Sequence, residues 1–161
     1  MRVVVADPEH EEEVLPVTEQ AGNGYSLRVE RVIAAKAEAI FDAFVALYEQ
    51  DRPDWVTRSE LDLRPGGRWL VGFDVPGEGA FQEERVLTVV ERPSHLAYDM
   101  RTVSYEPADF ATHLDLTIER MPEGQRVRLE QQGFPTEQTR DVFAAAWPDV
   151  LAEIARRVEG G

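Results

Sequence analysis

The stretch that decides the fold is Asp62-Leu63-Arg64-Pro65-Gly66-Gly67-Arg68-Trp69. Proline presets the backbone φ at the second position of a tight turn, and glycine accepts the positive φ that the third position requires. The four residues from Arg64 to Gly67 are therefore predicted to reverse the chain between two strands, at residues 59–63 and 68–73. The strands and helices before and after this hairpin are predicted from the periodicity of their apolar residues.

Alternating apolar and polar residues predict further strands before and after the hairpin. Alternation with a period of two is typical of a half-buried strand. It occurs at residues 25–29, 81–90, 96–100, 114–118 and 127–131, and Val86, Thr88 and Val90 are expected on one face of the 81–90 strand. Seven strands linked by short turns predict an antiparallel sheet, one face of which must be covered.

Two segments have a helical period instead. The first is residues 36–50, and the second begins after Thr136, which is a plausible N-cap. The second carries one apolar stripe, made of Phe143, Trp147, Val150, Leu151, Ile154 and Val158. Pro148 lies within this stripe and is expected to kink the helix near Trp147. The fold class is therefore α+β, with the C-terminal helix as the only long cover for the sheet.

Three stretches resemble a known family. They are residues 27–33 with residues 39–44, the hairpin at residues 62–69, and Gly133-Phe134-Pro135 followed by Trp147 and Leu151. Over about residues 25–159 the chain resembles the START-like, helix-grip (SRPBCC) superfamily, and in particular the homologues of the heat-shock protein 90 ATPase activator. The resemblance implies a curved antiparallel sheet of about seven strands wrapped around a long C-terminal helix, with a cavity between them.

The sequence departs from that family at two positions near the implied cavity. Only Trp55 remains where members often have two tryptophans, and Arg85 stands where members often have glycine. The domain is predicted to span residues 25–161. Residues 1–24, which contain the acidic run Glu11-Glu12-Glu13, are predicted to be a flexible tail. The alternative is that residues 2–5 add an edge strand.

Composition narrows the partners. The formal net charge is −14, which disfavours nucleic acid and anionic membrane surfaces. The chain has no cysteine, which excludes a thiol nucleophile and fits a reducing cytoplasm, where we expect the protein to be. The three histidines, His10, His95 and His113, have no metal-ligand spacing and are predicted to be solvated. We therefore predict no metal and no cofactor.

Aromatic side chains are the most informative candidates for a site. The proposed ligand-binding residues are Trp55, Trp69, Phe73, Tyr98, Phe143 and Trp147. If the sheet wraps the C-terminal helix, these side chains converge, either as ordinary core or as the lining of a cavity for a small apolar or aromatic ligand. In the second case Tyr98 O–H and the tryptophan N–H groups would orient the ligand.

Two other functions stay open at this stage. A cyclase- or aromatase-type enzyme would need an acid or base in the same cavity, and the sequence offers Tyr98, Gln131 and Arg85 but no carboxylate predicted to face inward. Glu83 and Glu84 point to opposite faces of their strand and are interpreted as solvated charge. We therefore assign no catalytic residue, and an enzyme is the less favoured reading. The third function is a chaperone-cofactor-like interaction module. The sequence also leaves open whether the chain forms a homodimer.

Overall fold

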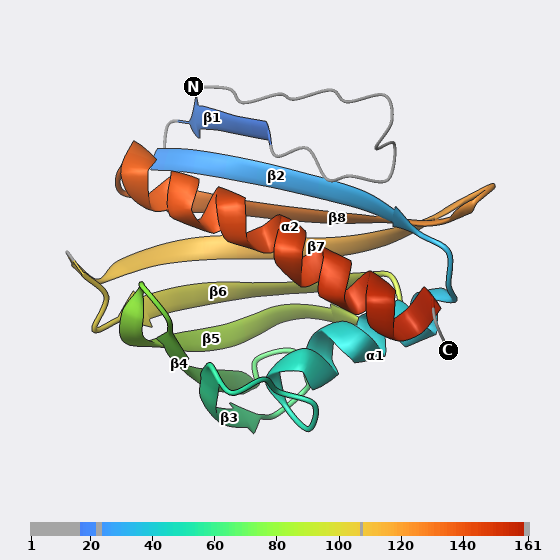
Figure 1. The fold of residues 1–161 in the computed structure, drawn as a ribbon, viewed down its shortest axis with the longest axis horizontal. Helices are drawn as coiled ribbons and strands as arrows, with labels where there is room; N and C mark the ends of the chain where they lie inside the picture. The colour runs from blue at the N-terminus through green and yellow to red at the C-terminus, as the bar shows by residue number, and fades with distance from the viewer. Residues whose placement is uncertain (1–16, 22–23, 107, 160–161) are drawn as a thin grey trace.

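The computed structural model describes residues 17–21, 24–106 and 108–159. They form one eight-stranded antiparallel sheet with two helices on one of its faces (Figure 1). The elements in chain order are β1 (Val17–Ala21), β2 (Gly24–Ile33), α1 (Ala37–Tyr48), β3 (Val56–Leu61), β4 (Arg68–Val75), β5 (Gly79–Glu91), β6 (His95–Val103), β7 (Phe110–Met121), β8 (Gly124–Phe134) and α2 (Glu137–Glu159). The α+β helix-grip class predicted from sequence is confirmed.

The spatial order of the strands is β1-β2-β8-β7-β6-β5-β4-β3. The seven strands predicted from alternation are β2 to β8, so the predicted meander is confirmed. The eighth strand, β1, was not foreseen. It pairs with β2 from Val17↔Arg28 to Ala21↔Gly24, within a segment predicted to be a flexible tail. The alternative edge strand at residues 2–5 lies outside the described residues.

Helix α2 crosses the inner face of the sheet diagonally, and α1 lies beside its C-terminal half (Figure 1). Thr136 caps α2 as predicted, because its Oγ1 accepts a hydrogen bond from the Thr139 backbone N–H at 3.1 Å. The helix is continuous through Pro148. Its buried stripe includes Phe143, Trp147, Leu151 and Ile154, which join side chains of α1 and the sheet in a single core.

The turn between β3 and β4 has the predicted geometry. The Gly67 N–H donates to the Arg64 carbonyl at 2.8 Å, and Gly66 at the third position has φ +82°. The turn is also tied to β5, because Gly66 N–H donates to the Leu87 carbonyl and Leu87 N–H donates to the Gly67 carbonyl. The turn is therefore held against β5 at Leu87 by two backbone hydrogen bonds.

The surroundings of Gly66 and Gly67 predict that replacing each by alanine destabilises the protein to a different extent. A Cβ at Gly66 meets no atom within 4 Å, so Gly66→Ala should cost only the positive φ, about 1 kcal/mol. A Cβ at Gly67 would lie 2.0 Å from the Asp62 carbonyl oxygen, which belongs to the backbone and cannot turn aside. We expect Gly67→Ala to lower the free energy of unfolding by several times more, measured by urea denaturation. Equal costs would contradict this account of the turn.

Candidate functional site

A cavity of about 540 Å³ lies between α2, the C-terminal end of α1 with the loop after it, and strands β4 and β5. Its volume is within the range of pockets that enclose a small organic molecule. The lining is mainly aromatic and aliphatic, with a few charged side chains. The lining residues are Leu47, Tyr48, Pro53, Trp55, Phe73, Val75, Phe81, Glu83, Arg85, Phe143, Ala146, Trp147, Asp149, Val150, Glu153 and Arg157.

Four of the six residues predicted to form a site line this cavity. They are Trp55, Phe73, Phe143 and Trp147. Trp55 stacks on Phe73 with ring centroids 6.0 Å apart, and Phe73 stacks on Phe81 at 5.0 Å. One wall is thus a continuous stack of rings from the loop after α1 to β5. This wall offers flat apolar contact, which suits another ring.

The other two predicted residues, Trp69 and Tyr98, do not line the cavity. Both are fully buried, and their rings pack edge to face at 5.8 Å. Trp147 also differs from expectation in its polar group: its indole N–H donates to Gln131 Oε1 at 2.8 Å, and Gln131 in turn donates to Thr112 Oγ1 at 3.0 Å. The Trp147 N–H is therefore already used within the protein and is not available to orient a ligand.

The most informative residues of the cavity were not predicted to belong to it. Glu83 is 5% exposed and Arg85 is 2% exposed, so the interpretation of Glu83 as solvated charge is wrong. Glu84, on the opposite face of β5, is exposed, as the alternation predicts. Both Nε and Nη2 of Arg85 donate to Glu83 Oε1, with Nε at 3.0 Å. The pair is a buried salt bridge in the lining of an aromatic cavity.

The inward residues of β5 are Phe81, Glu83, Arg85 and Leu87. Val86, Thr88 and Val90 were expected on one face, but Val86 is 42% exposed and Thr88 is exposed, whereas Val90 packs against the core. The register of β5 against β6 shifts between Leu87 and Val89, so alternation counted back from Val90 gives the wrong face. Alternation counted forward from Phe81 would have placed Glu83 and Arg85 inside.

Three aromatic rings surround the Arg85 guanidinium. Its carbon lies 4.4 Å from the ring centre of Trp69, 4.7 Å from that of Tyr98 and 4.8 Å from that of Tyr48. Cation–π contacts of this kind stabilise a desolvated cation. Burial raises the pKa of the Tyr48 and Tyr98 hydroxyls well above their usual range, so both phenols are neutral at pH 7. The charge in this cluster is confined to Arg85 and Glu83.

The rim of the cavity on α2 is charged and exposed to solvent. Glu153 accepts hydrogen bonds from Arg156 Nε at 3.0 Å and from Arg157 Nε at 2.8 Å. These two guanidinium groups hold the pKa of Glu153 at about 2. Asp149 is the other acidic group at the rim. The opening therefore carries acidic and basic groups side by side.

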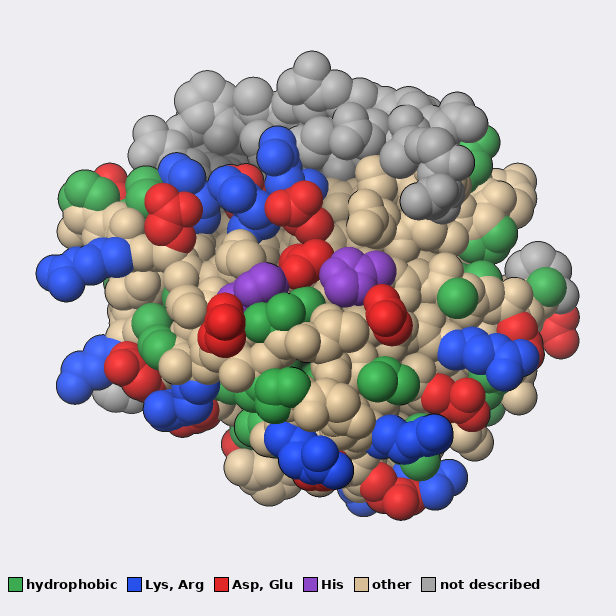
Figure 2. Space-filling view, turned by 180° about the vertical axis from the view of Figure 1, so that it is seen from behind, with side chains coloured by type: hydrophobic (Ala, Val, Ile, Leu, Met, Phe, Trp, Pro, Cys, Tyr) green, Lys and Arg blue, Asp and Glu red, His purple; other side chains and the backbone are tan. Residues whose placement is uncertain are grey.

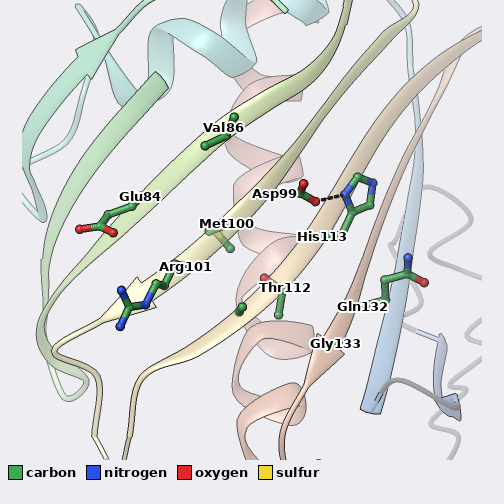
Figure 3. A pocket seen from close by; sticks show the side chains of 10 residues that line it. Glu84, Val86, Asp99, Met100, Arg101, Thr112, His113, Gln132 and Gly133 are labelled. Carbon is green, nitrogen blue, oxygen red and sulfur yellow. Dashed lines mark hydrogen bonds and ion pairs between the residues drawn. The ribbon is translucent and has the colours of Figure 1, made fainter. Parts of the chain in front are cut away.

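A second hollow, of about 490 Å³, is an open groove on the outer face of the sheet, across strands β5 to β8 (Figure 3). His113 is one of its lining residues, and Figure 2 shows histidine side chains flanked by acidic groups on this face. The rings of His113 and His95 are bridged by Asp115, and His113 Nδ1 also lies 2.8 Å from Asp99 Oδ1. Both histidines face away from the core as expected, but they are held by carboxylates.

The hydrogen-bonded row of Asp99, His113, Asp115 and His95 links the neighbouring strands β6 and β7. Asp99 and His113 are direct partners across β6 and β7. Within the residues that the structure describes, no group of three or more histidine, cysteine or acidic side chains is placed to hold a metal ion. No helix among those residues has both the length and the apolar character needed to cross a membrane.

The comparisons with known proteins agree with this architecture. The family model for "Activator of Hsp90 ATPase homolog 1-like protein" matches residues 34–159, and the chain belongs to this family. The resemblance seen in the sequence is thereby confirmed. The fold of this family accommodates ligand-binding cavities between sheet and helix, and the cavity described above lies in that place.

Solved structures with the same fold include three bacterial proteins. An AHSA1-like protein from Aeromonas hydrophila is 25% identical over 84% of this chain and 92% of that one, with a TM-score of 0.62. Proteins from Mesorhizobium loti and Chromobacterium violaceum are 19% and 20% identical, cover 81% and 83% of this chain and 94% and 97% of their own, and both have a TM-score of 0.65. A search of curated proteins gives no match.

The buried salt bridge predicts an asymmetric effect on stability. Arg85→Met leaves the Glu83 carboxylate buried without its partner, which should cost about 3–5 kcal/mol. Adding Glu83→Gln removes that charge, so the double variant should be more stable than Arg85→Met alone. Urea denaturation of the wild type and of both variants measures this. If the double variant is as unstable as Arg85→Met, loss of the salt bridge is not the cause.

Proposed function

We propose that this protein binds a small, largely aromatic molecule in the cavity between α2 and strands β4 and β5. The observation that supports this most is the cavity itself, of about 540 Å³, with Trp55, Phe73, Phe81 and Phe143 in its lining. Side chains of this type that served only as core would pack without a hollow of this size, because protein interiors are close-packed. These side chains would therefore contact a ligand in addition to packing in the core.

The apolar lining is sufficient for modest affinity. A ligand that buries about 150–250 Å², as an aromatic side chain does, gains roughly 4–6 kcal/mol at about 25 cal/mol per Å². This gain is of the same order as the cost of association, about 4 kcal/mol or more, so apolar contact alone gives at most modest affinity. Tighter binding would require a polar contact as well.

A cyclase- or aromatase-type enzyme is the second candidate, because Glu83 is an inward carboxylate in the cavity. An acid–base role requires that the carboxylate exchange a proton with a substrate. Glu83 Oε1 instead accepts two hydrogen bonds from Arg85, so that oxygen is already engaged within the protein. Tyr48 and Tyr98, with their raised pKa values, are weak acids. These contacts favour binding over catalysis.

Two neighbouring alanines of α2 provide a matched test. Ala145 and Ala146 are both exposed, but only Ala146 lines the cavity. We expect N-phenyl-1-naphthylamine, a neutral probe whose emission rises in apolar surroundings, to bind the wild type and to raise its melting temperature. Ala146→Phe should fill the entrance and weaken binding at least tenfold, whereas Ala145→Phe should bind as the wild type does.

Both variants add the same side chain to adjacent exposed positions, so a change in helix stability affects both alike. Thermal melting of each free variant checks that they fold. Failure of the wild type to bind this probe and other neutral naphthalenes would contradict the proposed function. Equal loss of binding in the two variants would place the probe outside this cavity.

A further inference from the structure

We infer that the Arg85–Glu83 pair makes the cavity selective for an uncharged aromatic ligand that carries a hydrogen-bond acceptor, such as an aryl ketone or amide, and that it rejects aromatic carboxylates. This inference rests on the proposed function, because it names the class of ligand for the same cavity. It concerns two side chains in the lining of that cavity, Arg85 and Glu83.

The first argument is that the hydrogen-bond donors around Arg85 outnumber the acceptors that they bind. Glu83 occupies Nε and Nη2 of Arg85, and the remaining Nη1 is buried with no hydrogen-bond partner among the described residues. The Tyr98 hydroxyl and the Trp69 indole N–H are likewise buried without a hydrogen-bond partner among the residues that the structure describes. Both belong to rings that pack on the guanidinium.

Buried donors without a partner are costly, at about 1–3 kcal/mol each. An acceptor brought in by a ligand would relieve that cost. Arg85 lines the cavity, whereas Trp69 and Tyr98 do not, so Arg85 is the residue of the three that a ligand in the cavity would contact. A carbonyl oxygen has two lone pairs and no proton, which makes it complementary to a guanidinium edge.

The second argument is charge. Glu83 already neutralises Arg85, so a ligand carboxylate would add an uncompensated negative charge to a buried site. The other charged lining residues do not correct this, because Arg157 donates to Glu153 and Asp149 adds another carboxylate. The lining thus holds three carboxylates and two guanidinium groups. A neutral acceptor gains the hydrogen bond without this electrostatic cost.

Three probes of nearly the same shape separate these effects. They are 2-isopropylnaphthalene, which has no acceptor, 2-acetylnaphthalene, a neutral ketone, and 2-naphthoate, an anion at pH 7. Each is titrated as a competitor of N-phenyl-1-naphthylamine. We expect the ketone to bind about tenfold more tightly than the hydrocarbon, which is about 1.4 kcal/mol, although the hydrocarbon is more apolar. We expect 2-naphthoate to bind at least tenfold more weakly than the ketone.

Two adjacent glutamates of β5 give a matched pair of variants. Glu83→Gln removes the charge that balances Arg85 and keeps the shape, so 2-naphthoate should gain at least tenfold relative to the ketone. Glu84→Gln makes the same change on the outer face of the sheet, outside this cavity, and should leave the order of the probes unchanged. Thermal melting confirms that each variant is folded, and the wild-type series decides the matter if Glu83→Gln does not fold.

The outcomes distinguish this inference from the proposed function. If none of the three probes binds the wild type, the proposed function fails. If the hydrocarbon binds but the ketone is no tighter, or 2-naphthoate binds as tightly as the ketone, the cavity binds ligands and the inferred selectivity is wrong. If Glu83→Gln and Glu84→Gln change the order of the probes equally, the effect is one of overall charge rather than of the buried pair.

Discussion

The cavity exists because one helix has to cover a sheet much wider than itself. Eight strands about 4.8 Å apart span about 34 Å, whereas a helix with its side chains is about 10–12 Å across. Helix α2 lies closest to β2 and α1 and approaches β1 and β8 less closely. The inner face of β4 and β5 is therefore left to α1, its following loop and the aromatic side chains. The hollow lies where these groups and α2 leave a gap.

The polar pair occupies that gap because of the pleat of β5. Once Phe81 and Leu87 face the core, the pleat turns residues 83 and 85 inward as well. Two charges there are costly to desolvate, and the chain compensates by joining them to each other and surrounding the guanidinium with three rings. Burial by itself disfavours the charged guanidinium, but Glu83 raises the pKa of Arg85 and keeps it charged. The gap thus combines an aromatic wall with one fixed dipole.

Most of the fold was predictable because local patterns and tertiary packing agree. The Pro65-Gly66 turn, the seven alternating strands and the stripe of α2 each carry a clear period. Strand β1 was missed because an edge strand needs little apolar sequence and lies in an acidic segment. In the site, Phe73, Phe143 and Trp147 follow from element-facing positions. Glu83 was missed because charge was assumed to be solvated, although its alternation with Phe81 pointed inward. Trp69 and Tyr98 could not be told from lining residues, because Arg85 covers them.

The Arg85–Glu83 pair also bears on whether the cavity binds a ligand or catalyses a reaction. A catalytic base needs lone pairs that are free in the resting state, and a catalytic acid needs a proton that leaves near neutral pH. Here Glu83 Oε1 accepts two hydrogen bonds from Arg85, and the two phenols beside the pair have pKa values raised by burial. The buried donors without a partner, which are Arg85 Nη1, the Tyr98 hydroxyl and the Trp69 N–H, can hold an acceptor but cannot remove a proton from it. Apolar walls together with these donors would fix the orientation of a neutral guest, which is why the proposed function is binding rather than catalysis.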